Sequence, residues 1–128
     1  RRMANVADES AKRRDPTWTI FDGYDDGFAE SSPVGSFGPN DVGLYDIAGN
    51  VWEWCADWYD EAYFDEIYFG RVSSENPAGP ARSGFRVLRG GSWYSDPSEV
   101  RVSSRFRAEP SSRDDYIGFR CVRVSPSP

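Results

Sequence analysis

Three short segments that combine glycine with tryptophan, phenylalanine and arginine constrain this chain more than any other feature of its sequence. They are residues 43–54 (GLYDIAGNVWEW), 86–93 (RVLRGGSW) and 118–123 (GFRCVR). Glycine lets backbone segments approach each other closely, while large aromatic and guanidinium groups fill and fix the space beside them. The segments therefore predict a fold in which loops pack around tryptophan and arginine.

Length and charge narrow the possible classes of protein. A chain of 128 residues allows one domain with one modest core. Its 15 basic and 21 acidic residues, net charge −6, argue against a nucleic-acid binder, which would show a basic face. There is no run of about 18 apolar residues, so we expect no membrane insertion.

The residues that bind metals and catalyse proton transfer are scarce. The chain has no histidine, which removes the commonest general base and a common zinc or copper ligand. Its two cysteines, Cys55 and Cys121, are not spaced as metal ligands. We expect both to be buried thiols, and they leave the redox compartment open.

Helical periodicity is weak along the whole chain. Residues 51–58 fit either a strand or a short helix, and periodicity does not decide between them. We expect strands at 85–88, 100–106 and 117–124, and one or two helical turns within 59–69. The pattern predicts a loop-rich α+β domain with short antiparallel strands over residues 1–124, followed by a frayed tail at 125–128.

Taken in order, the three glycine-rich segments resemble the formylglycine-generating-enzyme (sulfatase-modifying factor) family, whose fold is a variant of the C-type lectin fold. The resemblance runs from Asn5 to Val124. It implies the C-terminal, larger part of the family domain, because the family's usual N-terminal strands and helix have no counterpart here. We therefore expect either a piece of a longer protein or a minimal version of the domain.

Acidic loops with nearby glycines can supply the oxygen ligands that calcium needs, although no EF-hand pattern is present. Read from the residues alone, these loops fit ordinary solvated acidic loops as well. The resemblance implies two calcium ions, each held by two side chains and two backbone carbonyls. The first set is Asp46 and Glu53 with the carbonyls of Gly49 and Val51; the second is Asn5 and Asp26 with the carbonyls of Val6 and Phe28.

The family's enzymes use copper and oxygen to convert a sulfatase cysteine into formylglycine. They hold the copper with two thiolates shortly after the Gly-Gly-Ser-aromatic segment. Ser95 and Val100 stand at or near those two positions here. Neither side chain can replace the soft thiolates that Cu(I) prefers, so we expect no copper and no oxidase chemistry. A related iron-dependent oxygenase activity needs several histidines, which this chain lacks.

Residues 94–116 are rich in tyrosine, serine and aspartate, as antibody paratopes are. Arginines recur among them at intervals that suit scaffold contacts. The segment also resembles the variable proteins of diversity-generating retroelements, in which mutated template adenines turn Asn codons into Tyr, Ser, Asp or Phe codons. The candidate ligand-binding residues are Tyr94, Ser95, Asp96, Ser98, Ser103, Phe106, Ser111, Ser112, Asp114, Asp115 and Tyr116.

The sequence thus favours a non-catalytic, calcium-stabilised domain that binds a protein or another macromolecule. Three alternatives stay open: an ordinary non-catalytic family member, a sulfatase-modifying oxidase, and a structural accessory domain of a larger protein such as a kinase or lipoprotein. Two side-chain groupings follow from the preferred interpretation. We expect a buried scaffold of Trp52, Trp54, Trp93, Phe119 and Arg120, and an exposed face of Tyr94, Asp96, Phe106, Asp115 and Tyr116.

Overall fold

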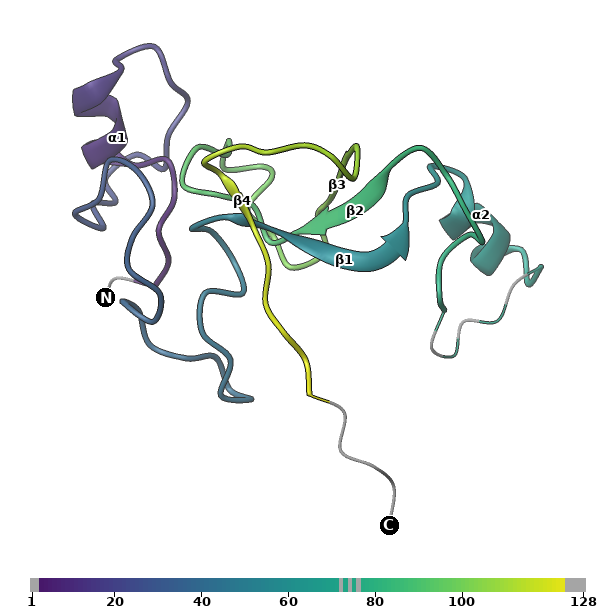
Figure 1. Cartoon of the computed structure of the whole chain (residues 1–128). Helices are drawn as coiled ribbons and strands as arrows, with labels where there is room; N and C mark the ends of the chain where they lie inside the picture. Colours follow the sequence, from purple (N-terminus) through teal and green to yellow (C-terminus); the bar gives the residue numbers. More distant parts are fainter. Residues whose placement is uncertain (1–2, 72, 74, 76, 124–128) are drawn as a thin grey trace.

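The computed structural model describes residues 3–123 except 72, 74 and 76 (Figure 1). Turns and loops make up most of that part of the chain. None of its helices is long and apolar enough to cross a membrane. The regular elements are α1 (Glu9–Arg14), β1 (Trp52–Trp58), α2 (Tyr63–Tyr68), β2 (Arg86–Arg89), β3 (Arg105–Ala108) and β4 (Ile117–Gly118).

The strands form one curled, mixed sheet in the order β3-β2-β1-β4 (Figure 1). The β1–β2 and β2–β3 pairings are antiparallel, with Leu88 opposite both Trp54 and Phe106. The β1–β4 pairing is parallel and places Trp52 opposite Ile117. The expected antiparallel strands are therefore present, but the closing strand runs parallel to its neighbour. This parallel step brings the segment before β4 to the start of β1.

The structure confirms some of the predicted helices and strands and gives others different bounds. The undecided segment 51–58 is the strand β1, and the predictions of a strand at 85–88 and of helical turns within 59–69 are confirmed by β2 and α2. The strand predicted at 100–106 starts only at Arg105. The Ser104 N–H donates to the Arg101 carbonyl at 2.9 Å, which closes a turn just before the strand. The strand predicted at 117–124 ends at Gly118. Val124 and the predicted frayed tail lie outside the described residues.

The helix α1 was not expected from the polar N-terminal stretch. Its N-cap is Asp8, whose carboxylate accepts hydrogen bonds from the backbone N–H groups of Ser10 (2.8 Å) and Ala11 (3.3 Å). Three basic residues occupy its last turn, where they complement the helix dipole. A helix of six residues is too short to show a helical period in the sequence, so only its caps could have revealed it.

The core lies against the sheet and is centred on β2. Leu88 and Val87 are fully buried there, and Trp52 and Trp93 are only 5% and 6% exposed. The other buried apolar residues are Val6, Ala7, Ala11, Ile20, Phe37 and Tyr63.

The predicted scaffold is correct only for two of its tryptophans. Trp52 and Trp93 are buried, whereas Trp54 is half-buried. Phe119 is 74% exposed, and the side chain of Arg120 is 35% exposed. The reason is that pairing with β1 stops at Gly118, so the chain leaves the sheet before Phe119 can pack under it.

Candidate functional site

Two loops meet at a pair of tyrosine rings. The Tyr94 and Tyr116 rings are stacked with their centroids 6.0 Å apart and their planes 27° apart. Tyr94 is 51% exposed and Tyr116 is half-buried. The structure thus brings together two predicted binding residues that lie 22 positions apart in the sequence.

Buried groups hold both tyrosines in place. The residue before Tyr94 is Trp93, whose backbone N–H donates to the Asn50 carbonyl at 2.9 Å. The carbonyl of Tyr116 accepts a hydrogen bond of 2.8 Å from the backbone N–H of Trp52, at the start of β1. Both loops are therefore hydrogen-bonded to backbone groups at or just before the start of β1, which holds the two tyrosines close together.

Trp18 completes this aromatic cluster, and sequence reasoning missed it. Its ring meets Tyr94 edge to face at 4.8 Å and lies 5.8 Å from the ring of Trp93. Trp18 stands in the polar stretch after α1, where the only sequence signal was a large aromatic residue among turn formers. We define the Tyr94 surface as the rings of Trp18, Tyr94 and Tyr116 resting on buried Trp93.

Most of the remaining predicted binding residues are also exposed. Phe106 is 45% exposed on β3, and its ring packs 5.5 Å from that of Trp52. Asp96 is half-buried, and the hydrogen bonds that it accepts from Ser98 hold its pKa below the usual value. Ser112 is also half-buried, whereas the exposed members are Ser98, Ser103, Ser111, Asp114 and Asp115.

Ser95 was wrongly placed on the binding surface. It is only 3% exposed, and its hydroxyl accepts a hydrogen bond from the Ser92 backbone N–H at 3.2 Å. The two serine hydroxyls are also 3.3 Å apart. The turn after Trp93 directs Tyr94 outward and Ser95 inward, so a ligand on the surface cannot reach the Ser95 side chain.

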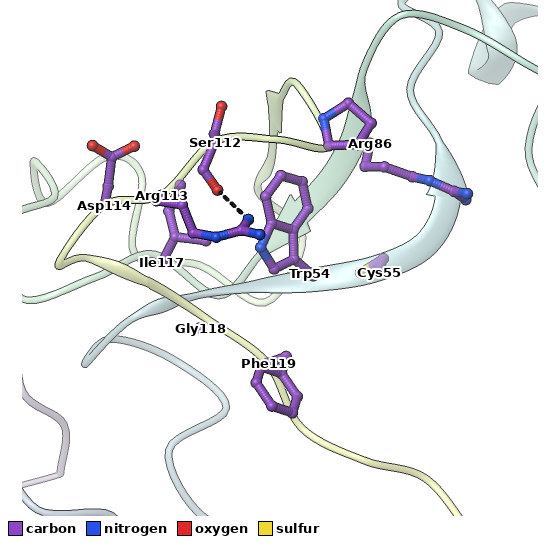
Figure 2. A pocket seen from close by; sticks show the side chains of 10 residues that line it. Trp54, Cys55, Arg86, Ser112, Arg113, Asp114, Ile117, Gly118 and Phe119 are labelled. Atoms are coloured by element: carbon purple, nitrogen blue, oxygen red, sulfur yellow. Dashed lines mark hydrogen bonds between the residues drawn. The ribbon is translucent and has the colours of Figure 1, made fainter.

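A cavity of about 630 Å³ is lined in part by the loop that carries Ser112 and Asp114 (Figure 2). The ring of Trp54 and the side chain of Ile117 line its inner part, and Phe119 stands at its far side. The guanidinium of Arg113 lies beside Trp54 and donates to the Ser112 carbonyl at 3.2 Å. Cys55 also borders this cavity, and burial raises the pKa of its thiol, which makes it a poor nucleophile.

The first predicted calcium site contains an arginine in this structure. Both carboxylate oxygens of Glu53 accept hydrogen bonds from Arg120, whose Nη2 also donates to the carbonyls of Tyr45 (3.0 Å) and Asp46 (3.2 Å). One carboxylate oxygen of Asp46 accepts a hydrogen bond from the Gly35 N–H at 2.7 Å. The Arg120 guanidinium thus lies between the Glu53 carboxylate and the Asp46 carbonyl, so a calcium ion fits here only if Arg120 moves.

The second predicted calcium site offers a buried oxygen that has no partner. Asn5 is 1% exposed, and its Oδ1 has no hydrogen-bond partner among the described residues, although its Nδ2 donates to the Glu30 carbonyl at 2.8 Å. Asp26 is fully buried and accepts from the backbone N–H groups of Val6 (2.9 Å) and Phe28 (2.7 Å). Burial raises the pKa of Asp26 to about 6. A buried carboxylate near an unpaired amide oxygen fits a calcium ion.

Within residues 3–123 except 72, 74 and 76, no three His, Cys, Asp or Glu side chains are grouped so that they could hold a metal ion. Calcium at either position would therefore depend on backbone carbonyls as well as on its two side chains. A glycine supports this arrangement: Gly49 has φ 81°, and a Cβ there would collide with the Asn5 carbonyl. Gly49 thus brings the two loops of the predicted calcium sites into contact.

The copper chemistry of the family has no ligands at the expected positions. The Ser95 hydroxyl is engaged with Ser92, and Val100 packs against Gly91, where a Cβ would lie 3.1 Å from the Val100 Cα. Of the two free cysteines, Cys55 is half-buried on β1 and Cys121, expected to be buried, is exposed. A hydroxyl and an isopropyl group do not fit Cu(I), which prefers thiolates.

Comparison with known proteins agrees with this architecture. Among sequence relatives, "Serine/threonine-protein kinase pkn1" of Chlamydia pneumoniae is 42% identical over 95 residues, which are 74% of this chain and 15% of the kinase. "Formylglycine-generating enzyme" of Streptomyces coelicolor is 41% identical over 101 residues, 77% of this chain and 31% of the enzyme. "Inactive C-alpha-formylglycine-generating enzyme 2" of Bos taurus is 39% identical over 113 residues, 84% and 31% of the two chains.

Two solved structures share the fold. PvdO from Pseudomonas aeruginosa superposes with a TM-score of 0.62 and 38% identity, over 80% of this chain and 36% of PvdO. Treponema denticola variable protein 1 superposes with a TM-score of 0.59 and 33% identity, over 85% and 36% of the two chains. The chain spans at most 31% of the length of the three sequence relatives above.

The loop-rich α+β architecture expected from the sequence is thereby confirmed. Enzymes and an inactive protein both occur among the relatives, so membership does not by itself imply catalysis. The match to the family covers residues 2–125, nearly the whole chain. The chain therefore belongs to the family of Sulfatase-modifying factor enzyme 1-like domains, whose fold resembles that of C-type lectins.

Proposed function

We propose that this chain is a non-catalytic, calcium-stabilised domain that binds a macromolecular ligand through the Tyr94 surface. The observation that carries the proposal is the stacked pair of Tyr94 and Tyr116, contributed by two loops and resting on buried Trp93. Exposed aromatic rings grouped on one face have no folding reason and commonly mark an interaction site. Tyrosine also supplies a large contact area at a small cost in side-chain entropy.

The residues at the family's copper positions support a role in binding rather than oxidation. Ser95 and Val100 stand where the resemblance puts the two thiolates, and both are packed inside the loop. The inactive bovine relative matches 84% of the length of this chain. Loss of catalysis on this fold therefore has a parallel among the relatives of the chain.

The likeness to Treponema denticola variable protein 1 supports a variable surface at residues 94–116. The Tyr, Ser, Asp and Phe residues there are those that adenine mutagenesis can reach from Asn codons. The genomic test is a near-copy of the coding segment for residues 93–118, with adenines at the variable codons, next to a reverse-transcriptase gene. Absence of such a copy would favour an ordinary non-catalytic member instead.

The binding role is tested by selecting random peptides displayed on phage against the wild-type chain. We expect the selected peptides to lose at least about tenfold in affinity for the Tyr94→Ser/Tyr116→Ser variant, since tyrosine anchors often dominate binding energy. The control is Tyr68→Ser, which removes a tyrosine ring that is 84% exposed on α2, outside the Tyr94 surface. If the selected peptides bind all three proteins alike, the Tyr94 surface is not the binding site.

The absence of oxidase activity is tested with Cu(I), oxygen and a peptide that contains the Cys-x-Pro-x-Arg sequence. Mass spectrometry should find the peptide cysteine unmodified after incubation with this chain. A formylglycine-generating enzyme run in parallel shows that the conditions support the reaction. Formylglycine above the level of a sample without protein would contradict the non-catalytic assignment.

A further inference from the structure

Carboxylates surround the Tyr94 surface. Asp114 and Asp115 directly precede Tyr116, and both are exposed. Burial raises the pKa of the Tyr116 phenol, and the negative charges of the adjacent Asp114 and Asp115 raise it further. None of the ion pairs in the described part of the chain involves either carboxylate. Two carboxylates that take part in none of these ion pairs therefore lie next to Tyr116, whose ring stacks on the exposed ring of Tyr94.

A further carboxylate lies beside Trp18. Asp15 accepts hydrogen bonds from the Thr17 N–H (2.9 Å) and hydroxyl (2.7 Å), which together with a weaker contact to Trp18 hold its pKa below the usual value. Asp96 stands two residues after Tyr94, and hydrogen bonds from Ser98 lower the pKa of its carboxyl. The three loops that carry these rings thus also carry carboxylates near them in the sequence, so the local electrostatic potential favours a cation.

Two arginines close to these carboxylates in the sequence, Arg113 and Arg107, have their guanidinium groups directed to other partners. The Arg113 guanidinium points toward Trp54 in the cavity, away from the Asp114 carboxylate (Figure 2). Arg107 lies over the rings of Tyr59 and Phe85, within 3.8 Å of Glu61.

We propose that the Tyr94 surface binds a protein partner through an exposed arginine side chain of that partner. A guanidinium is planar, so it can lie over the exposed part of the Tyr94 ring while its N–H groups reach Asp114 or Asp115. Stacking on a ring and pairing with a carboxylate need a flat cation with several donors, which favours arginine over lysine. This inference rests on the proposed binding function and adds the chemistry of the partner.

The probes are three nine-residue peptides that differ only at three positions, which hold arginine, lysine or the neutral isostere citrulline among glycine and serine. Affinity for the full chain is measured by ¹⁵N chemical-shift titration near physiological salt, where contacts between distant surface charges are screened. We expect the arginine peptide to bind at least about fivefold more tightly than the citrulline peptide, with lysine between them.

Two charge-matched variants separate a specific site from general attraction to an acidic protein. Asp114→Asn/Asp115→Asn removes two charges at the surface, and Asp65→Asn/Glu66→Gln removes two from exposed positions on α2. The first should lower affinity for the arginine peptide at least about fivefold, and the second should change it less than twofold. Backbone amide shifts should stay native-like in both variants, which excludes unfolding as the cause.

Equal binding of the arginine and citrulline peptides, equal losses in both charge-matched variants, or no binding of the arginine peptide would each overturn the inference. Sequences selected on phage distinguish this failure from failure of the proposed function. If those peptides depend on Tyr94 but are not enriched in arginine, the surface binds a ligand and the cationic partner is wrong. If no selected peptide depends on Tyr94, the binding function itself is wrong.

Discussion

Replacing Arg120 with glutamine should destabilise the domain by removing a link between segments that are far apart in the sequence. Arg120 follows β4, and it binds Glu53 on β1 and the carbonyls of Tyr45 and Asp46. These partners lie 67 to 75 positions away in the sequence. The single guanidinium therefore ties the segment after β4 to the loop before β1.

The size of the effect follows from the exposure of the two partners. Hydrogen bonds to a charged group contribute about 1.5–3 kcal/mol when desolvated, whereas fully exposed ion pairs contribute about 0–1 kcal/mol. The Arg120 and Glu53 side chains are 35% and 20% exposed, so we place the loss at about 1–2 kcal/mol. For a domain of this length the melting temperature should fall by roughly 4–10 °C.

The assay is thermal unfolding followed by tryptophan fluorescence, with excess chelator and with calcium. The control is Arg82→Gln, which removes the same charge from an exposed position outside the site. Arg120→Lys should recover only part of the loss, because an ammonium cannot bridge both carboxylate oxygens as a planar fork does. If calcium can replace the guanidinium between Asp46 and Glu53, the loss should be smaller in calcium than in chelator.

A melting temperature for Arg120→Gln equal to that of Arg82→Gln would refute this reasoning. It would mean that the Arg120–Glu53 contact exchanges with solvent and does not hold the two segments together. Full recovery by lysine would leave a role for charge but none for the bidentate geometry.

Three further predictions concern the core, the loop contact and the ions. Trp93→Ala should cost about 3–5 kcal/mol in urea unfolding, because Trp93 is 6% exposed; a cost below about 1 kcal/mol would contradict its core position. Gly49→Ala should cost more than about 2 kcal/mol, since φ is 81° and a Cβ would meet the Asn5 carbonyl, whereas Gly84→Ala, in open space, should be tolerated; equal stabilities would contradict this. Excess chelator should lower the melting temperature of the wild-type chain through lost ion binding, and an unchanged curve would argue against bound calcium.

Some properties could be predicted because they depend on short stretches of sequence. The predicted strand at 85–88 corresponds to β2, which ends at Arg89, directly before Gly90 and Gly91 at φ 97° and 78°. The lack of thiolates at Ser95 and Val100 was likewise visible from residue identity alone. Together with the other two motifs, these local features were sufficient to indicate the family and the fold.

Neighbouring residues with different environments could not be separated in this way. The residues 119 and 120 follow each other in one motif, yet Phe119 is exposed and Arg120 turns back to Glu53. Ser95 resembles the exposed serines around it but is buried by its bonds to Ser92. The direction of the Phe119 and Arg120 side chains depends on β4 ending at Gly118. The direction of the Ser95 side chain depends on the turn that follows Trp93.

The contacts that define the candidate site were decided by tertiary structure alone. Tyr94 and Tyr116 stack because the parallel pairing of Trp52 with Ile117 brings the end of the second loop to the start of β1. Trp18 reaches Tyr94 from a separate loop 76 positions away. The sequence by itself determined which residue types were available for binding. Which of them share a surface was set by sheet register and loop packing, since contacts between distant segments leave no local pattern in the chain.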